Sequence, residues 1–234
     1  MNDTYFIFYV PGMMGSLLSI LIKSQVEKNF QFKGFSDNTA HDYAQDAFLN
    51  THTYSQYIDF KKKNIPIEKH LTENYKKNES LLQRCDINWA NSFIHKNLKC
   101  TIAYIGNLDC KIKNFIKMRN IYPQMKEYIN EPQSNFNFKI DPTHKNYEKI
   151  LLLKYIIWCI NQEEKYKKLF NSIDLFPIIK NKNFENFEKV CKITNKKILY
   201  SIVDSYNNNQ KNVIGHKDTL EFVEKYIKLH QIEA

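Results

Sequence analysis

The stretch Tyr5–Ile22, YFIFYVPGMMGSLLSILI, decides which fold the chain can adopt. Its 18 residues carry no charge, which fits the length of a membrane span or of a signal-peptide core. Pro11, Gly12 and Gly15 interrupt its middle, however, and the residues before it include Asp3 and no basic side chain. The pattern therefore predicts a buried strand, a tight loop and a helix in place of one membrane-spanning helix.

In this interpretation Tyr5–Val10 forms the strand, Pro11–Gly15 forms the loop, and Ser16 begins a helix that runs to about Phe30. The helix carries apolar residues at i, i+1, i+4 and i+5, which is the pattern of a buried helical face: Leu17, Leu18, Leu21 and Ile22.

The same order of strand, loop and helix returns further along the chain. Cys100–Ile105 predicts a second buried strand, and Asp109 is placed to cap the helix that follows. Asn146 to about Ser172 predicts a long helix, and Phe176–Ile179 predicts a third, short strand. Further helices are expected over 184–191, over 198–206 and from about Asp218.

These elements predict one domain, residues 1–234, of the α/β class. Hydrophobic residues make up 43% of the chain, enough for a core, while five glycines and six prolines provide too few turns for an all-β protein. The central sheet is expected to be mostly parallel, with Tyr5–Val10 and Cys100–Ile105 as central strands and helices on both faces. Residues 36–97 are polar and irregular; they predict short helices, one of them with a cap-like start at Ser36-Asp37.

Charge and cysteine content limit the expected partners. Lys and Arg exceed Asp and Glu by 34 to 25, but the lysines are scattered among acidic residues, so nucleic-acid binding is not expected. No two of the five cysteines lie closer than ten residues and no H-x-x-x-H spacing occurs, so neither a disulfide framework nor a metal site is expected. Reduced thiols and the absence of a membrane span predict a soluble, cytoplasmic protein.

The loop Pro11–Ser16 is a candidate anion site. At the start of a helix, backbone N–H groups and the helix dipole favour an anion, and glycine lets the backbone approach a phosphate closely. The Ser16 hydroxyl is expected either to cap the helix or to bond a phosphate oxygen. The lysine of a Walker A motif is missing, which excludes a standard ATPase loop. An ordinary tight turn without a ligand is the alternative.

Taken in order, five segments resemble the sulfotransferase family of the P-loop-like α/β type. Val10–Leu17 is similar to the family's phosphosulfate loop, P-x-S-G-T-T, with a one-residue difference in length. Thr51–Thr53 resembles the T-H stretch that carries the family's base, and Tyr104–Asp109 resembles R-N-x-x-D. Phe176–Ile193 is similar to the strand, turn and helix of the Y-E-D-L type. Lys211–Lys217 and the helix after it resemble K-G-x-x-G-x-W-K.

This resemblance implies a P-loop-like, nucleotide-binding transferase. It would move a sulfuryl group from 3′-phosphoadenylyl sulfate to a hydroxyl of a carbohydrate, protein or small molecule, without a metal, and leave adenosine 3′,5′-bisphosphate. His52 would be the general base, because imidazole suits neutral pH; His95 and Arg119 are second-rank candidates. A surface histidine and solvated lysines are the alternative interpretations of His52, Lys211 and Lys217. The implied donor-binding residues are Gly12, Met13, Met14, Gly15, Ser16, Leu17, Asn107, Asn114, Lys211, Gly215 and Lys217.

The chain departs from the family pattern where the donor's sulfate and 3′-phosphate would bind. Gly12 or Met13 replaces the basic residue of the first loop, Gly106 replaces the arginine before Asn107, and Asn114 replaces the serine. A non-catalytic binding or structural protein on a degenerate transferase fold therefore stays open. The first loop also resembles the oxyanion loop of lipase-like α/β-hydrolases, but the G-x-S-x-G elbow of that class is absent.

Overall fold

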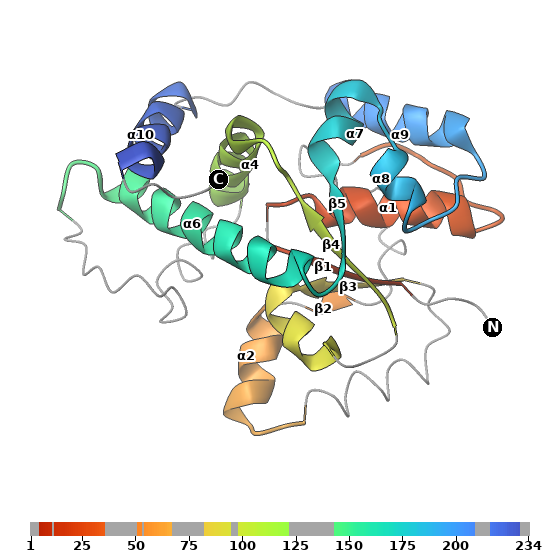
Figure 1. The fold of residues 1–234 in the computed structure, drawn as a ribbon, viewed down its shortest axis with the longest axis horizontal. Helices are drawn as coiled ribbons and strands as arrows, with labels where there is room; N and C mark the ends of the chain where they lie inside the picture. The colour runs from red at the N-terminus through yellow and green to blue at the C-terminus, as the bar shows by residue number, and fades with distance from the viewer. Residues whose placement is uncertain are drawn as a thin grey trace.

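The structure, a computed structural model, describes residues 5–10, 12–35, 51–52, 54–66, 82–94, 98–121, 143–208 and 216–229. Its strands are β1 (Tyr5–Tyr9), β2 (Thr51–His52), β3 (Leu82–Asp86), β4 (Lys99–Tyr104) and β5 (Asn171–Asp174). They form one sheet in the order β2-β3-β1-β4-β5, and every neighbouring pair among them is parallel (Figure 1). The predicted α/β class and mostly parallel sheet are confirmed.

Helices connect and follow these strands. They are α1 (Gly15–Val26), α2 (Tyr54–Lys62), the 3-10 helix η2 (Ile87–Phe93), α4 (Leu108–Ile121), α6 (Tyr147–Lys167), α7 (Leu175–Asn181), α8 (Glu185–Glu188), α9 (Lys196–Asn208) and α10 (His216–Leu229).

The central strand is β1, which pairs with β3 on one side and β4 on the other. Its side chains alternate between two buried faces. Phe6 and Phe8 pack against Phe93 of η2, with ring centroids 4.8 and 5.2 Å apart, whereas Tyr9 lies against Gly15 of α1. A strand buried on both faces is apolar throughout, which is why the sequence identified it correctly.

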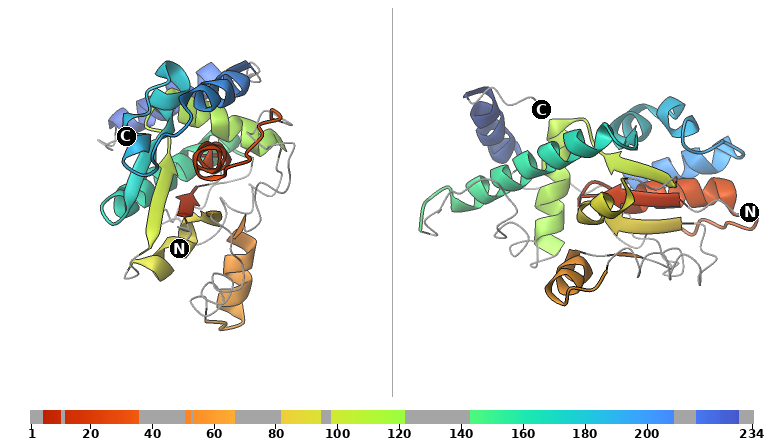
Figure 2. Two further views of the ribbon diagram at one scale, coloured as in Figure 1. Left: turned by 90° about the vertical axis from the view of Figure 1, so that its right-hand side faces the viewer. Right: turned by 60° about the horizontal axis from the view of Figure 1, so that its bottom comes forward.

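Helices cover both faces of the sheet, as predicted. α1 packs on β1, β3 and β4, and α9 packs on α1; the left view of Figure 2 shows α1 end-on beside the sheet. On the opposite face lie η2 and the end of α6, where the Lys167 ammonium stands 3.8 Å from the ring centroid of Tyr104. Phe170, just after α6, stacks on Phe8 at 5.6 Å on that same face.

The carboxyl ends of the strands meet at one edge of the sheet. Tyr9 lies level with Asp86 on β3 and Ala103 on β4, and Tyr104 lies level with Asp174 on β5. After β1 the chain crosses toward β2, whereas after β4 it crosses to the other side, toward β5. The gap between β1 and β4 is thus a topological switch point, where open α/β sheets bind ligands. Beyond this edge α4, α10 and the first part of α6 pack together (Figure 1).

Helix α1 differs slightly from the prediction at both ends. It begins at Gly15 and not at Ser16, because Met14 already takes the N-cap position. It ends at Val26, before the expected Phe30, since Glu27 is extended with φ −95° and ψ 117°.

The third predicted strand was wrong. Phe176–Ile179 lies in α7, and the strand is instead Asn171–Asp174, so α6 ends at Lys167 and not near Ser172. The Asp174 carboxylate accepts the Phe176 N–H at 2.9 Å, which caps α7 and ends the strand. Pro177 fits this first helical turn because its missing N–H is not needed there.

The region 36–97 contains two strands that the sequence did not indicate, β2 and β3, beside the expected short helices α2 and η2. β3 reads LQRCD and lacks the apolar run that marked β1. The helix expected over 184–191 is shortened to α8, while α9 and α10 lie where the sequence placed the last two helices. The cap-like Ser36-Asp37 lies outside the described residues.

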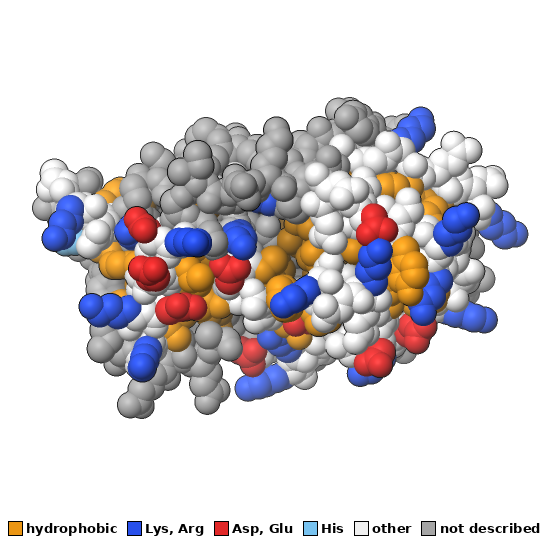
Figure 3. Space-filling view, turned by 90° about the horizontal axis from the view of Figure 1, so that it is seen from above, with side chains coloured by type: hydrophobic (Ala, Val, Ile, Leu, Met, Phe, Trp, Pro, Cys, Tyr) orange, Lys and Arg blue, Asp and Glu red, His pale blue; other side chains and the backbone are white. Residues whose placement is uncertain are grey.

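Within the described ranges, no helix combines the length and apolarity that crossing a membrane requires. On the face seen in Figure 3, Lys and Arg side chains are interspersed with Asp and Glu, and apolar side chains show between them.

Candidate functional site

The connection between β1 and α1 is a tight, buried turn. The Met13 N–H donates to the Val10 carbonyl at 2.8 Å. Gly12 and Met14 both have positive φ, 91° and 56°, which suits glycine but is uncommon for methionine. Met13 and Leu17 are fully buried in the core. The loop can therefore offer a ligand mainly its backbone.

Helix α1 begins without a capping side chain. Met14 occupies the N-cap position and its side chain makes no cap hydrogen bond, and the first turn contains no acidic residue. Ser16, which the sequence offered as a possible cap, lies inside that first turn and is buried. The N-terminal amides and the positive end of the helix dipole thus point to the sheet edge where β1 ends.

Gly15 has a packing role that needs no ligand. A Cβ at this position would lie 2.5 Å from Tyr9 Cγ and 2.8 Å from Tyr9 Cβ. The residue is helical, and the positive φ values of the loop fall at Gly12 and Met14 instead. Gly15 lets α1 approach β1 closely, which is the task of the glycine that ends many strand–helix turns.

The turn between β4 and α4 is capped by its own side chain. The Cys110 N–H donates to Asn107 Oδ1 at 2.9 Å, so Asn107 caps α4. The predicted cap, Asp109, lies within the first turn and pairs with Lys113 at 3.0 Å. The side-chain oxygen of Asn107 is therefore already engaged.

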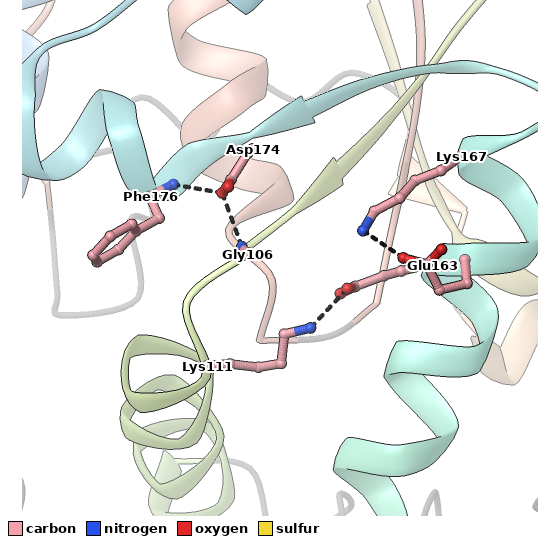
Figure 4. A network of polar contacts seen from close by, with 7 residues as sticks. Gly106, Lys111, Glu163, Lys167, Asp174 and Phe176 are labelled. Atoms are coloured by element: carbon pink, nitrogen blue, oxygen red, sulfur yellow. Dashed lines mark hydrogen bonds and ion pairs between the residues drawn. The ribbon is translucent and has the colours of Figure 1, made fainter. Parts of the chain in front are cut away.

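Asp174 ties this turn to β5 and α7. Its Oδ1 accepts the Gly106 N–H and the Phe176 N–H, each at 2.9 Å (Figure 4). A Cβ on Gly106 would collide with the other carboxylate oxygen, Oδ2. The arginine that the sulfotransferase pattern has at this position cannot be accommodated unless Asp174 moves.

A buried ion pair joins α4 to α6 close to this turn. Lys111 Nζ lies 2.7 Å from Glu163 Oε2, and the two side chains are only 6% and 2% exposed (Figure 4). Burial raises the pKa of the Glu163 carboxyl, although the Lys111 ammonium acts to lower it. Glu163 Oε1 and Asn114 Nδ2 are both buried and have no hydrogen-bond partner among the described residues.

Glu163 lies on a buried face of α6 together with Tyr155 and Cys159. Tyr155, Cys159 and Glu163 follow one another at intervals of four residues. Burial raises the Tyr155 pKa well above its ordinary value, and Cys159 and Asp86 add to the rise. Asp86 is buried at the end of β3 and accepts the Asn88 N–H at 3.0 Å and the Asn88 side-chain amide at 2.7 Å.

The sequence did not indicate Lys111, Glu163, Asp86 or Asp174 as residues of the site. The spacing of Tyr155, Cys159 and Glu163 was a usable signal, because it places the carboxylate on the face of an otherwise apolar helical stripe. No local signal marked Asp86, since β3 has no apolar run.

His52, the predicted base, lies at the end of β2. Its backbone is level with Cys85 on β3, which is level with Phe8 on β1. Two strand spacings, roughly 10 Å, therefore separate the His52 and Phe8 backbones. The structure brings His52, the β1–α1 loop and Asn107 to the same edge of the sheet. His95, Lys211 and Gly215 lie outside the described residues, as do the side chains of His52 and Arg119.

Lys217 is exposed near the start of α10. The next residue, Asp218, lies 4.0 Å from Lys149 near the beginning of α6. Lys149 is about four helical turns, roughly 21 Å, from Glu163 along α6. The structure does not bring Lys217 to the buried pair between α4 and α6.

In the part of the chain that the structure describes, no group of three or more His, Cys, Asp or Glu side chains is arranged to hold a metal ion. Comparison of the chain with protein-family models, with curated proteins and with solved structures found no match.

Proposed function

We propose that the β1–α1 loop binds the phosphate of a nucleotide-like donor, and that the chain transfers a sulfuryl group from 3′-phosphoadenylyl sulfate to a hydroxyl. One observation carries the proposal: α1 begins at the switch point of the sheet with neither a capping side chain nor an acidic residue in its first turn. Such a helix start suits a phosphate group.

In the proposed reaction the acceptor oxygen bonds to sulfur as the bond between sulfur and the bridging phosphate oxygen breaks. Adenosine 3′,5′-bisphosphate leaves, and the hydroxyl proton passes to a base, for which the resemblance implies His52. Backbone N–H groups of the first turn of α1 would stabilise the negative charge on the departing phosphate. The chain's contribution is thus positioning and electrostatic stabilisation.

Calorimetric titration with adenosine 3′,5′-bisphosphate tests the binding step. We expect binding in the wild type and about tenfold weaker binding in Ser16→Ala, because a hydrogen bond to a charged phosphate is lost. Ser24→Ala is the matched control: it removes a buried hydroxyl at the other end of α1, where Ser24 donates to the Leu21 carbonyl at 2.7 Å. Binding should be unchanged in that variant. Absence of heat at millimolar nucleotide would contradict the proposal.

A second candidate is a non-catalytic protein on the same fold. The observation that favours it concerns Gly106 and Asn107, at positions where the resemblance implies contacts with the sulfuryl donor. Here the Gly106 N–H is bonded to Asp174, and the Asn107 side chain caps α4. Release of adenosine 3′,5′-bisphosphate from 3′-phosphoadenylyl sulfate, stimulated by hydroxyl compounds, would exclude this alternative. Nucleotide binding without any such release would establish it.

A further inference from the structure

Helices α4 and α6, which pack against each other, each carry one buried polar atom that lacks a hydrogen-bond partner among the described residues. They are Asn114 Nδ2, a donor, and Glu163 Oε1, an acceptor. Asn114 is 7% exposed, and the Glu163 side chain is 2% exposed. Buried polar groups are almost always satisfied in native proteins, so two unsatisfied atoms at one contact call for an explanation.

Helix spacing indicates that the two atoms face the same contact between α4 and α6. Lys111, whose ammonium binds Glu163 Oε2, precedes Asn114 by three residues, and side chains with this spacing are neighbours on a helix, roughly 5–6 Å apart at Cβ. Phe115, next to Asn114, meets Tyr155 of α6 edge-on with ring centroids 4.6 Å apart. Asn114 and Glu163 thus flank the same helix–helix contact, yet do not bond each other.

The chemistry of this pair selects a hydroxyl group. A hydroxyl can donate its proton to Glu163 Oε1 and accept the Asn114 amide proton at the same time. A phosphate or carboxylate would meet the negative Glu163 oxygen, and an ammonium group could not accept from Asn114. Lys111 neutralises the far oxygen of Glu163 and fixes the carboxylate in position.

We propose that Asn114 and Glu163, positioned by Lys111, form a subsite that binds a hydroxyl group of a small ligand. Asn114 would then contact a hydroxyl, whereas the sequence resemblance implied a 3′-phosphate at this position. Binding of a hydroxyl compound here needs no sulfuryl donor; only the further role of this subsite as the acceptor end of the reaction rests on the proposed function.

Benzyl alcohol and anisole are a matched pair of probes, because they are isomers and only the alcohol can donate a hydrogen bond. Phe115 and Tyr155, both buried, pack edge-on at this contact, which is why both probes carry an aromatic ring. Each is titrated into the ¹⁵N-labelled 234-residue chain, with the backbone amide signals of Phe115 and Glu163 as readout. Benzyl alcohol should shift both signals with an affinity at least about fivefold higher than that of anisole.

Asn114→Leu tests the site without disturbing the ion pair. It is nearly isosteric and replaces an unsatisfied amide by an apolar group, so the melting temperature should stay the same or rise. Benzyl alcohol should bind about tenfold more weakly, to the level of anisole. Glu163→Gln should weaken benzyl alcohol in the same way and leave anisole unaffected.

Equal affinities for the two isomers would overturn the proposal, because binding would then depend on the phenyl group and not on the hydroxyl. So would absence of shifts with either probe, which is the result expected if a fixed water molecule satisfies both atoms. Titration with adenosine 3′,5′-bisphosphate separates this inference from the proposed function. Binding of benzyl alcohol without binding of the nucleotide would retain the subsite and remove its acceptor role.

Discussion

Two strand–loop–helix units lie side by side at the centre of this sheet, and their helices begin in opposite ways. In the first unit α1 follows Met14, which has a left-handed backbone and makes no side-chain cap. In the second, α4 is capped by Asn107, and the preceding Gly106 is bound by Asp174. In the second turn side chains bond the free N–H groups, whereas in the first turn no side chain caps the start of the helix.

This difference indicates where a ligand fits. An anion at the start of α4 would have to displace the Asn107 cap and lie beside Asp174, whereas an anion at the start of α1 would displace no capping side chain. Both units contain a glycine that permits close packing, Gly15 against Tyr9 and Gly106 against Asp174. Glycine content by itself therefore did not distinguish a ligand loop from a structural one.

The largest effect is expected for Gly15→Ala. Its Cβ would meet Tyr9 Cγ at 2.5 Å, so the free energy of unfolding, measured by urea denaturation, should fall by about 3 kcal/mol. The same change in a Tyr9→Ala background should cost far less, because the opposing ring is gone. An equal cost in both backgrounds would show that close packing against Tyr9 is not what Gly15 provides.

Gly106→Ala should destabilise the second unit by about 2 kcal/mol in the same assay. The new Cβ collides with the Asp174 carboxylate, which must move and weaken its bonds to the Gly106 and Phe176 N–H groups. In an Asp174→Ala background the substitution should be nearly neutral. If the losses of unfolding free energy from the two substitutions simply added in the double variant, the new Cβ would not act through the Asp174 carboxylate.

Asn107→Ala should lower the free energy of unfolding by about 1 kcal/mol, the usual cost of a lost N-cap. Asn107→Asp is the control, since its carboxylate also accepts the Cys110 N–H and suits the start of a helix. Thermal unfolding of both variants checks this. If the aspartate variant lost as much stability as the alanine variant, the cap would not explain the role of Asn107.

The smallest effect is expected for the buried ion pair between Lys111 of α4 and Glu163 of α6. Burial raises the pKa of the Glu163 carboxyl in the folded state, so folding favours the protonated carboxyl. The stability that protonation contributes is present at low pH and is lost as the pH rises through the folded pKa. Lys111, Lys167 and Asp174 also act on this group. The unfolding free energy of the wild type, relative to Glu163→Gln, should therefore be higher at pH 4 than at pH 7. A difference independent of pH would contradict the raised pKa.

The sequence predicted the apolar elements well and the polar ones poorly. Tyr5–Val10 and Cys100–Ile105 were found because strands buried on both faces are continuous apolar runs. β3 was missed and β5 was misplaced, because LQRCD and NSID carry no such run and gain their strand conformation from pairing with β1 and β4. The choice between Asp109 and Asn107 as the cap lay within the uncertainty of helix boundaries.

For the candidate site, the sequence indicated the β1–α1 loop and the helix that follows it. It did not indicate that Gly15 packs on Tyr9, since no pattern of residue types reveals how closely a helix approaches a strand. It also missed Glu163, whose significance depends on meeting Lys111 from another helix.

The sequence by itself determined the α/β class, the parallel central strands and the positions of most helices, because periodicity and apolar runs are local properties of the chain. Only the tertiary structure decided which polar groups are satisfied. Asp174 reaches Gly106 across 68 residues of sequence, and Glu163 reaches Lys111 across 52. Such contacts depend on where the sheet places distant segments of the chain. They decide whether a turn is capped and whether a buried oxygen has a hydrogen-bond partner.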